Sequence, residues 1–158
     1  MTECDHEHES EGGLSGHHLH DALAEADARC ARASERMTQP RRRALEMLLE
    51  TGKPMKAYDL IAHFGGEGKA AKPPTVYRAL EFLSRQGLAH RIESLNAYVA
   101  CGVGDKSHAA AFLICDCCGA TREIEPFAPE RVQAAADKAG YRIDQVVVEA
   151  HGLCAVCA

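Results

Sequence analysis

Two pairs of cysteines near the C-terminal end constrain the fold of this chain more than any other feature. Each pair has the spacing Cys-x-x-Cys, and 35 residues separate Cys115 and Cys118 from Cys154 and Cys157. A tight turn with this spacing points two sulfur atoms at one ion, and four thiolates complete a closed tetrahedral zinc site. The intervening chain must then bring its last turn back beside the first. The sequence therefore predicts a structural zinc ion held by all four sulfur atoms.

The length of the chain and the composition of its N-terminus limit the classes of protein to which it can belong. The 158 residues suit one mid-sized domain or two small ones. No apolar run reaches membrane-spanning length, and the N-terminus is acidic and rich in histidine instead of basic and then apolar. We therefore expect a cytoplasmic protein with no membrane partner. Thiols stay reduced in that compartment, so the eight cysteines favour metal binding over a disulfide framework.

Redox chemistry is the main alternative for the cysteine pairs. A thioredoxin-like pair lies between a strand and a long helix, and neither pair has that setting here. A third thiol, Cys117, stands inside the first pair and has no partner at the same spacing. We expect it to be a free thiol beside the zinc site. A thiol switch built on Cys115, Cys117 and Cys118 stays open as an alternative.

The net charge of −5 is unevenly distributed along the chain. Residues 36–91 carry 11 basic and 5 acidic side chains, whereas residues 1–35 carry 9 acidic and 2 basic and residues 92–158 carry 9 acidic and 5 basic ones. Binding to phosphates depends on local charge and not on the total. The basic block between acidic flanks is therefore compatible with a nucleic-acid partner.

The N-terminal two thirds of the chain predict a winged helix-turn-helix. Residues 1–18 lack periodicity and are expected to form a disordered, His-rich tail. Helical spacing then begins at Leu19, and further helices are expected from near Pro40, over 57–64 and over 73–86. Two alternating runs, 88–93 and 97–101, predict a β-hairpin. Helices followed by a small hairpin describe a DNA-binding domain over 19–101.

The remaining sequence predicts a hinge and a second, smaller domain. Residues 102–107 form the hinge, and the domain over 108–158 is expected to contain strands at 109–114, 120–125 and 141–150 with a helix at about 129–139. A unit this small buries little apolar surface alone, which favours dimerisation or a metal staple. The predicted fold class is α+β: an N-terminal winged helix-turn-helix followed by a small α/β dimerisation domain.

A second set of metal-ligand types lies around the hinge: His90, Cys101, His108 and Glu123. If Leu95 and Asn96 are the central turn residues of the hairpin, His90 lies directly opposite Cys101, close enough to chelate one ion. A slip of one residue in the register destroys that pairing. One thiolate with two imidazoles favours zinc over iron or manganese. Taken singly, each of the four also has a purely structural explanation.

The helix expected over 73–86 has the character of a recognition helix. Its outward residues include Tyr77, Arg78 and Arg85, and the two arginines are seven residues apart and so share one face. An arginine near the N-terminal part of such a helix is the usual reader of guanine in the major groove. Further basic residues are candidates for phosphate contacts: Arg41, Arg42, Arg43, Lys53, Lys56 and Lys72. The alternative is an ordinary solvated face.

Together these segments resemble one known family. The matching stretches are AYDL (57–60), AKPPTVYRALEFLSRQGLAHRIES (71–94), YVAC (98–101), FLICDCCGATREIE (112–125) and EAHGLCAVC (149–157). They resemble the ferric uptake regulator (Fur) family, and specifically its zinc uptake regulator (Zur) branch. The resemblance covers about residues 19–158. It implies a homodimeric metalloregulator, not an enzyme, that binds double-stranded operator DNA and represses zinc uptake genes when zinc is bound.

The resemblance also assigns roles to residues. Cys115, Cys118, Cys154 and Cys157 match the structural zinc ligands, and a second set matches the regulatory zinc site: His90, Cys101, His108 and Glu123. Two zinc ions per subunit are therefore expected, with no small-molecule substrate. Tyr58 and Arg78 match positions that contact bases, and the full expected DNA-binding set is Tyr58, Tyr77, Arg78, Arg85, Arg41 and Lys72.

Some alternatives and departures stay open at this point. A zinc hydrolase that uses the hinge site is one alternative, although no general base or substrate pocket is evident. Iron or peroxide sensing is another, which the cysteine at position 101 disfavours. The family's usual Thr-Pro-Gln-Arg reads Thr-Gln-Pro-Arg over 38–41, so the second helix is expected to start differently. One histidine stands in the hinge where iron regulators carry several, so a third metal site is not expected.

Overall fold

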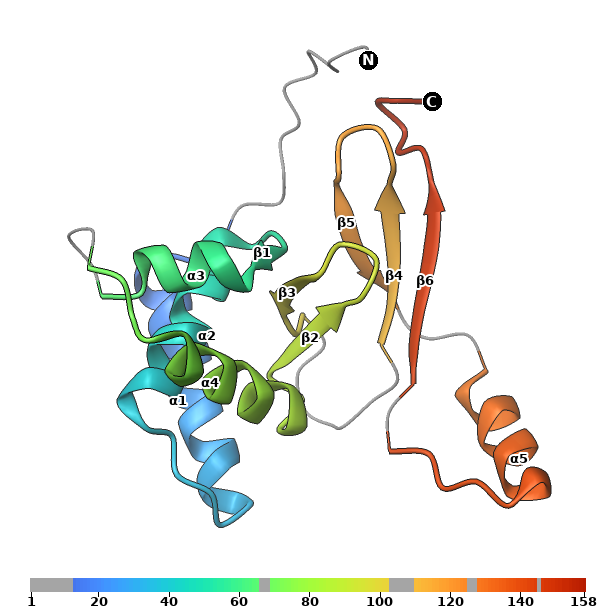
Figure 1. Ribbon diagram of the computed structural model, residues 1–158, viewed down its shortest axis with the longest axis horizontal. Helices are drawn as coiled ribbons and strands as arrows, with labels where there is room; N and C mark the ends of the chain where they lie inside the picture. The colour runs from blue at the N-terminus through green and yellow to red at the C-terminus, as the bar shows by residue number, and fades with distance from the viewer. Residues whose placement is uncertain (1–12, 66–68, 103–109, 125–127, 145) are drawn as a thin grey trace. The chain divides into compact units, whose positions relative to one another are not determined.

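The computed structural model describes residues 13–65, 69–102, 110–124, 128–144 and 146–158. These residues fall into two compact units, one within 13–102 and one within 110–158 (Figure 1). The fold class is α+β: the first unit is a winged helix-turn-helix and the second is a small α/β unit. In the part of the chain that is described, no helix combines the length and the apolar character that crossing a membrane requires.

Four helices build the first unit: α1 (Gly16–Arg32), α2 (Gln39–Thr51), α3 (Ala57–His63) and α4 (Pro73–Arg85). Helices α2 and α4 carry proline in their first turn, where the missing N–H costs no hydrogen bond. Helix α2 ends at Gly52, whose φ of 61° is the left-handed conformation that glycine adopts without strain. The four helices lie close to the positions that the periodicity predicts.

Helix α1 begins earlier than expected, inside the predicted tail. It starts at Gly16 instead of Leu19, and the extended residue Ser15 precedes it. The N–H of Leu14 donates to the carbonyl of Leu49 at 2.7 Å, which ties the start of α1 to the end of α2. The first turn of α1 consists of polar residues, which show no apolar periodicity, so the sequence pattern did not predict it. The remainder of the predicted tail, residues 1–12, lies outside the described residues.

The inward faces of these helices form one apolar core. The largest side chains buried there are those of Leu48, Leu60, Leu80, Leu83 and Phe82, all 0–1% exposed. Together with smaller buried residues such as Leu45, Ala57 and Val76 they recur at helical spacing, so each helix presents an apolar stripe to the core. Because one face of α4 packs in this core, the residues on its opposite face are the ones that point to solvent.

A small antiparallel sheet completes the first unit. It contains β1 (Met55–Lys56), β2 (Ala89–Ile92) and β3 (Ala97–Ala100) in the order β1-β3-β2. The strand β1 was not expected, because two residues are too few to show an alternating pattern. Strands β2 and β3 are the expected hairpin, which forms the wing.

The register of this hairpin differs from the prediction. Ile92 pairs with Ala97, so four residues and not two form the turn. The N–H of Asn96 closes the turn on the carbonyl of Glu93 at 3.1 Å, and Asn96 itself has a φ of 47°. Asparagine tolerates that left-handed conformation better than most residues. The expectation of a turn centred on Leu95 and Asn96 is therefore wrong.

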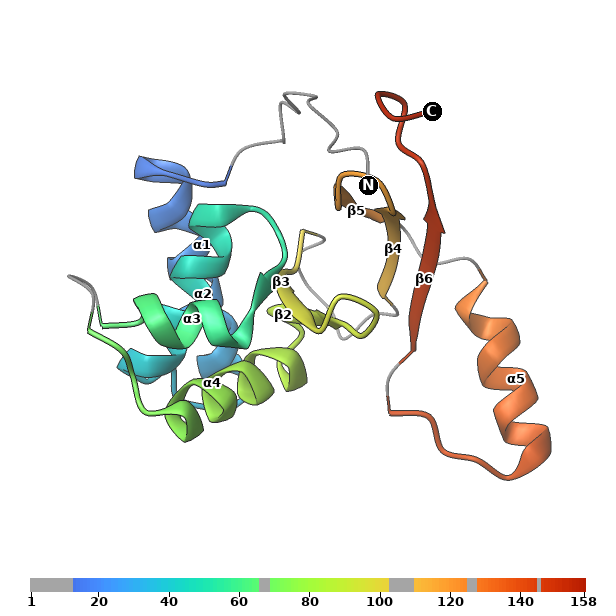
Figure 2. The ribbon, with the colours of Figure 1, turned by 45° about the horizontal axis from the view of Figure 1, so that its top comes forward.

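The second unit combines a three-stranded sheet with one helix. It contains β4 (Ala110–Cys115), β5 (Thr121–Ile124), α5 (Pro129–Ala139) and β6 (Val147–Gly152), with strand order β5-β4-β6. Strands β4 and β5 are antiparallel, whereas β4 and β6 are parallel. Figure 2 shows β6 beside β4, with the C-terminus at the end of the sheet where β4 turns into β5. The parallel pairing therefore returns the last turn of the chain to the first cysteine turn.

The final strand is shorter than expected and lies later in the sequence. A strand over 141–150 was expected, but β6 covers Val147–Gly152. Its partner β4 begins at Ala110, which pairs with Val147. The carbonyl of Val146 accepts a hydrogen bond from the N–H of Ala110 at 3.0 Å, and the chain bends at Asp144, whose carboxylate lies 3.3 Å from Arg142.

Candidate metal centres and nucleic-acid interface

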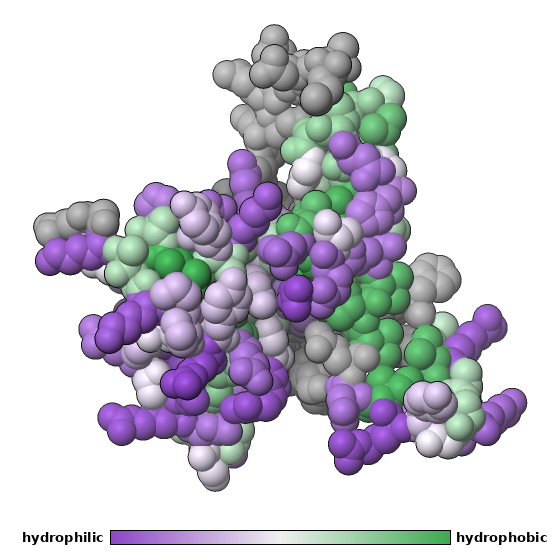
Figure 3. All heavy atoms as spheres, in the orientation of Figure 1, coloured by the Kyte–Doolittle hydropathy of each residue, from purple (hydrophilic) through white to green (hydrophobic). Residues whose placement is uncertain are grey.

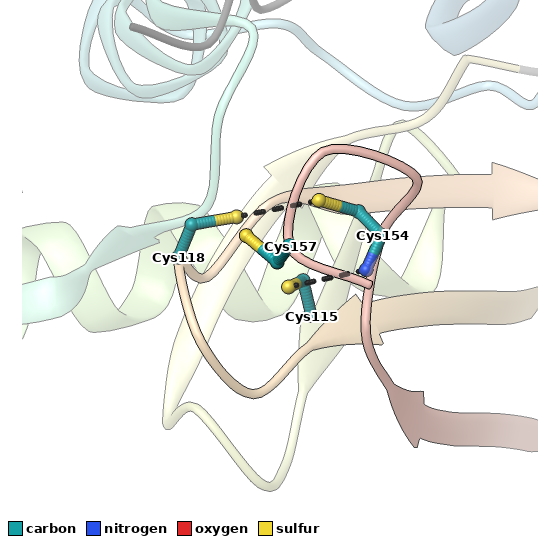
Figure 4. Close-up of side chains that lie close together, drawn as sticks. All are labelled: Cys115, Cys118, Cys154 and Cys157. Carbon is teal, nitrogen blue, oxygen red and sulfur yellow. Dashed lines mark hydrogen bonds between the residues drawn. The ribbon is translucent and has the colours of Figure 1, made fainter. Parts of the chain in front are cut away.

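The structure brings the four cysteines of the two Cys-x-x-Cys pairs together in the second unit. Cys115 is the last residue of β4, and a single residue separates the end of β6 from Cys154. Figure 4 shows the four side chains converging from these two turns. The sulfur atoms all lie within 4.8 Å of one another, and those of Cys118 and Cys154 are 3.8 Å apart.

Main-chain hydrogen bonds shape both turns. The N–H of Gly119 donates to the carbonyl of Cys115 at 2.8 Å, and the N–H of Cys157 donates to the carbonyl of Cys154 at 2.9 Å. Gly119 has a φ of 73°, which the first turn requires. The N–H of Asp116 also donates to the carbonyl of Gly152 at 2.8 Å, which joins the first turn to the end of β6.

The spacing of the sulfur atoms fits a tetrahedral zinc ion. Zinc–sulfur bonds of about 2.3 Å place two ligands of a tetrahedron about 3.8 Å apart. The observed separation between the sulfur atoms of Cys118 and Cys154 is 3.8 Å. Four sulfur donors leave no open position on the ion, which is the arrangement of structural rather than catalytic zinc sites.

The pKa values of the clustered thiols also favour binding of a cation. Main-chain N–H groups of Cys118 and then Cys154 lower the pKa of the Cys115 thiol to about 6. By contrast, burial and then the neighbouring thiol of Cys154 raise the pKa of Cys157 to about 12. The pocket therefore accommodates one thiolate readily but resists further negative charge. A divalent cation removes this conflict, because it holds coordinating thiols in the deprotonated form.

A histidine and an aspartate connect the two cysteine turns from outside the cluster. The ring nitrogen Nδ1 of His151 lies 2.9 Å from Oδ1 of Asp116, and its Nε2 lies 3.7 Å from Glu149. The hydrogen bond with Asp116 raises the pKa of His151. No spacing pattern in the sequence signals this contact, because the two residues are 35 positions apart.

The remaining cysteine of the first turn is not a free thiol. Cys117 is disulfide-bonded in the structure, whereas the four cysteines of the cluster are free. The expectation of a free thiol at this position is therefore wrong. Cys117 does not belong to either group of candidate ligands in the described residues.

The wing of the first unit holds two residues of the second predicted metal site. His90 on β2 is buried, with 3% of its surface exposed, and Cys101 directly follows β3. His90 pairs with Val99, so the expectation that it lies directly opposite Cys101 is wrong. The register is shifted by two residues, however, and a shift of two keeps both side chains on one face of the hairpin. A ring nitrogen of His90 and the sulfur of Cys101 lie within 4.8 Å of each other.

The other two predicted ligands of that site belong to the C-terminal part of the chain. Glu123 lies on β5, pairs with Phe112 of β4 and is half-buried. His108 lies outside the described residues, as do residues 103–107 of the predicted hinge. The assignment of all four residues to one ion therefore stays a prediction.

Five of the six predicted DNA contacts have side chains that are open to solvent. Tyr58 on α3 and Tyr77 on α4 are 77% and 51% exposed, and Arg78, Arg85 and Lys72 are exposed as well. Among the described residues, the structure gives the side chains of Arg78 and Lys72 no hydrogen bond or ion pair. Figure 3 shows mainly hydrophilic side chains over α4. This face offers hydrogen-bond donors and positive charge.

Two of the six predicted contacts, Arg41 and the exposed Arg85, also interact with other side chains of the first unit. Arg41 lies over the ring of Phe82, and Arg85 lies 3.7 Å from Glu35. Two neighbours of Arg41 also form ion pairs: Arg42 with Asp27, and Arg43 with Glu46 at 2.6 Å. The basic block therefore divides into side chains that are open to a ligand and side chains that already have protein partners.

Comparisons with known proteins agree on one family. The model of the ferric uptake regulator family matches residues 32–151. The zinc uptake regulation protein of Escherichia coli (strain K12) is 42% identical over 137 residues, which cover 85% of this chain and 80% of that protein. The corresponding protein of Shigella flexneri matches equally well.

Solved structures give the same answer. A zinc uptake regulator complexed with zinc and DNA is 40% identical and superposes with a TM-score of 0.79, covering 88% of this chain and 94% of its own. A crystal structure of holo XcZur is 37% identical, with a TM-score of 0.77 and coverage of 87% and 96%. These relatives are regulators and not enzymes. The present chain is accordingly not an enzyme, and it belongs to the zinc uptake regulator branch of the ferric uptake regulator family.

Proposed function

We propose that this chain is a zinc-responsive transcriptional repressor, which binds operator DNA as a dimer when a regulatory zinc ion is bound and so controls genes for zinc uptake. The observation that carries the proposal is the pair formed by buried His90 and Cys101. Both side chains lie on the wing and offer donor atoms, one nitrogen and one sulfur, that suit zinc. The solved relative that holds both zinc and DNA supports the same function. A repressor of this kind acts in the cytoplasm.

Two zinc ions per subunit have separate tasks in this proposal. The first is structural and is held by Cys115, Cys118, Cys154 and Cys157. The second is regulatory and is held by His90, Cys101, His108 and Glu123. Sulfur and imidazole donors together favour zinc over iron or manganese at the second site. Four protein ligands also leave no position for a substrate, which argues against a zinc hydrolase.

The regulatory ligands belong to chain segments on both sides of the joint at 102–107. One ion held by all four ligands limits the freedom of that joint, so two recognition helices of a dimer can meet successive major grooves. Coupling between two ligands is reciprocal. Operator DNA must therefore tighten zinc binding by the same factor by which zinc tightens DNA binding.

The DNA interface in this proposal is the exposed face of α3 and α4. Arg78 reads guanine, Tyr58 and Tyr77 contact bases or sugars, and Lys72 neutralises a phosphate at the start of α4. Support comes from the exposure of all four side chains. Planar recognition of guanine is the commonest specific contact of arginine with DNA.

The second unit is the dimerisation domain in this proposal. Leu113 and Val148 are 45% and 41% exposed, and the parallel register of β4 and β6 places them on the same face of the sheet. Exposed apolar side chains that gather on one face mark interaction surfaces. A second copy of the chain is the partner proposed for this face.

The test compares DNA binding with zinc content. Duplexes are selected from a random-sequence library by the zinc-loaded wild-type protein, and binding is then measured with zinc added or chelated. We expect Cys101→Ser to weaken zinc-dependent binding while the protein remains a folded dimer. The matched control is Cys117→Ser under reducing conditions, which removes a thiol outside both ligand sets. Equal binding by wild type with and without zinc would contradict the proposal.

A further inference from the structure

A compact cluster of charged and aromatic side chains lies at the C-terminal end of α4. Three segments contribute to it: the loop between α1 and α2 gives Glu35, the first turn of α2 gives Arg41, and α4 gives Phe82 and Arg85. All four residues belong to the first unit. The cluster therefore joins the recognition helix to the two helices that precede the helix-turn-helix.

Arg41 covers the ring of Phe82. Its guanidinium carbon lies 3.5 Å from the ring centroid, and Phe82 is only 1% exposed. A contact this close suits arginine better than lysine, because the guanidinium is flat and more weakly hydrated than an ammonium. The same guanidinium donates to the carbonyl of Arg36 at 2.6 Å. Arg41 is therefore held by a ring on one side and by the preceding loop on the other.

Glu35 lies between the two arginines of the cluster. One carboxylate oxygen is 4.0 Å from Arg41 and the other is 3.7 Å from Arg85. Arg85 also approaches the ring of Phe82, with 5.7 Å between its guanidinium carbon and the centroid. Two cations beside one ring repel each other, and the carboxylate offsets that repulsion.

The loop conformation holds Glu35 in place. The N–H of Glu35 donates to the carbonyl of Cys30 at 2.8 Å, and the preceding residue, Ser34, has a φ of 57°. A left-handed serine is unusual and persists only where its surroundings enforce it. The backbone of the loop is thus bound to the end of α1, and the side chain that it presents is directed at α2 and α4.

We propose that Arg41 and Glu35 are positioning residues that fix the recognition helix α4 through Phe82 and Arg85, so that Arg41 is not one of the phosphate contacts expected for the basic block. The inference rests on the proposed DNA-binding function. It explains why an arginine in the basic block is stacked on a buried ring. The phosphate contacts then come from side chains such as Lys72, which has no hydrogen bond or ion pair among the described residues.

The first test separates a positioning role from a phosphate contact by the salt dependence of binding. The zinc-loaded full chain binds the selected duplex and a random-sequence duplex over a series of salt concentrations. We expect Arg41→Lys to weaken binding to the selected duplex by about tenfold, because lysine keeps the charge but loses the stack. Binding to the random-sequence duplex and the salt slope stay at their wild-type values.

The control variant shows what the loss of a phosphate contact looks like. Lys72→Ala is expected to weaken binding to both duplexes alike and to reduce the salt slope by about one. If Arg41→Ala behaves like Lys72→Ala while Arg41→Lys binds as wild type does, Arg41 is a phosphate contact and the inference is overturned.

A second variant decides the matter even if substitutions of Arg41 prevent folding. Glu35→Gln keeps the shape of the side chain and removes its charge. A positioning role predicts weaker binding to the selected duplex only. If Glu35 instead restrains two phosphate-binding arginines, its neutralisation tightens binding to both duplexes, which overturns the inference. If the wild-type protein selects no duplex, the proposed function is overturned. If the wild type selects a duplex and the Arg41 and Glu35 variants bind it equally well, only the present inference is overturned.

Discussion

The two units of this protein are held together in different ways. The first has a continuous apolar core to which helices α1 to α4 all contribute. In the second, the described residues that are buried come from a single strand, β4: Ala110, Ala111, Phe112, Ile114 and Cys115. The second unit adds four sulfur atoms within 4.8 Å of one another. The difference agrees with the proposed structural zinc ion, which would form part of the fold of the second unit, whereas the first unit has a core of its own.

This contrast separates two consequences of losing zinc. A unit with its own core stays folded without the metal, because burial of apolar surface supplies its stability. A unit with a small core depends on metal binding, whose free energy is then folding free energy. Substitutions in one unit are expected to leave the other intact, and the following predictions test that separation from the largest effect to the smallest.

The largest effect is expected for Cys154→Ser. Loss of one of four thiolates removes the structural ion, and binding of such an ion contributes on the order of 10 kcal/mol in small zinc domains. The second unit is expected to unfold and the protein to become monomeric, as measured by sedimentation and by hydrogen exchange. The first unit keeps its protected amides. Cys117→Ser, compared under reducing conditions, is the matched control in the same turn. An intact, zinc-loaded dimer of Cys154→Ser would contradict the structural assignment.

A smaller effect is expected for Leu80→Ala in the core of the first unit. Leu80 is fully buried, and such truncations cost about 2–5 kcal/mol through lost burial and the cavity left behind. Denaturant unfolding followed by hydrogen exchange is expected to show this loss in the first unit only. The second unit keeps its zinc. Leu153→Ala, at a side chain that is 60% exposed, serves as the control; simultaneous loss of zinc in Leu80→Ala would show that the units are not independent.

Arg78→Ala is expected to affect DNA binding alone. Its side chain is exposed, so the free energy of unfolding changes little, whereas loss of a guanine contact costs about 1–3 kcal/mol in binding. Fluorescence anisotropy on the selected duplex and on variants at single base pairs measures both the affinity and the relaxed specificity. Unchanged specificity would place Arg78 away from the bases.

The smallest effect concerns the hydrogen bond between His151 and Asp116. Because the pKa of His151 is raised in the folded state, its contribution to stability is fully present below the unfolded pKa and is lost as the pH rises through the folded pKa. The difference in stability between wild type and His151→Gln is therefore expected to be larger at mildly acidic pH than at alkaline pH. Chemical denaturation of the zinc-loaded proteins at both pH values measures it, with His63→Gln in the first unit as the control. A difference that grows with pH contradicts the assignment.

Local patterns were sufficient for most of the first unit. The apolar stripes of α2, α3 and α4 and the prolines in the first turns are short-range signals, and these helices lie where the periodicity places them. The wing was harder, because a turn of four residues and a turn of two produce the same alternating pattern on both strands. Either turn length places His90 and Cys101 on the same face of the hairpin, but only the two-residue turn pairs them directly, and that pairing was predicted wrongly.

Long-range effects explain the remaining differences. A hydrogen bond between Leu14 and Leu49 ties the start of α1 to the end of α2, and β6 pairs with β4 from Val147 onward. The link between Asp116 and His151 and the stacking of Arg41 on Phe82 likewise join residues far apart in sequence. No pattern along the chain encodes such partners. The cysteine pairs are the exception, because their chemistry requires that they meet.

A stepwise chelator titration of the wild-type protein tests the two-site account most directly. Zinc content, affinity for the selected duplex and hydrogen exchange in each unit are measured at every step. The account predicts that loss of the first zinc ion per subunit abolishes specific DNA binding while both units keep their protected amides, and that loss of the second unfolds the second unit. Loss of DNA binding and of the folded second unit in one step, with a single ion, would contradict it.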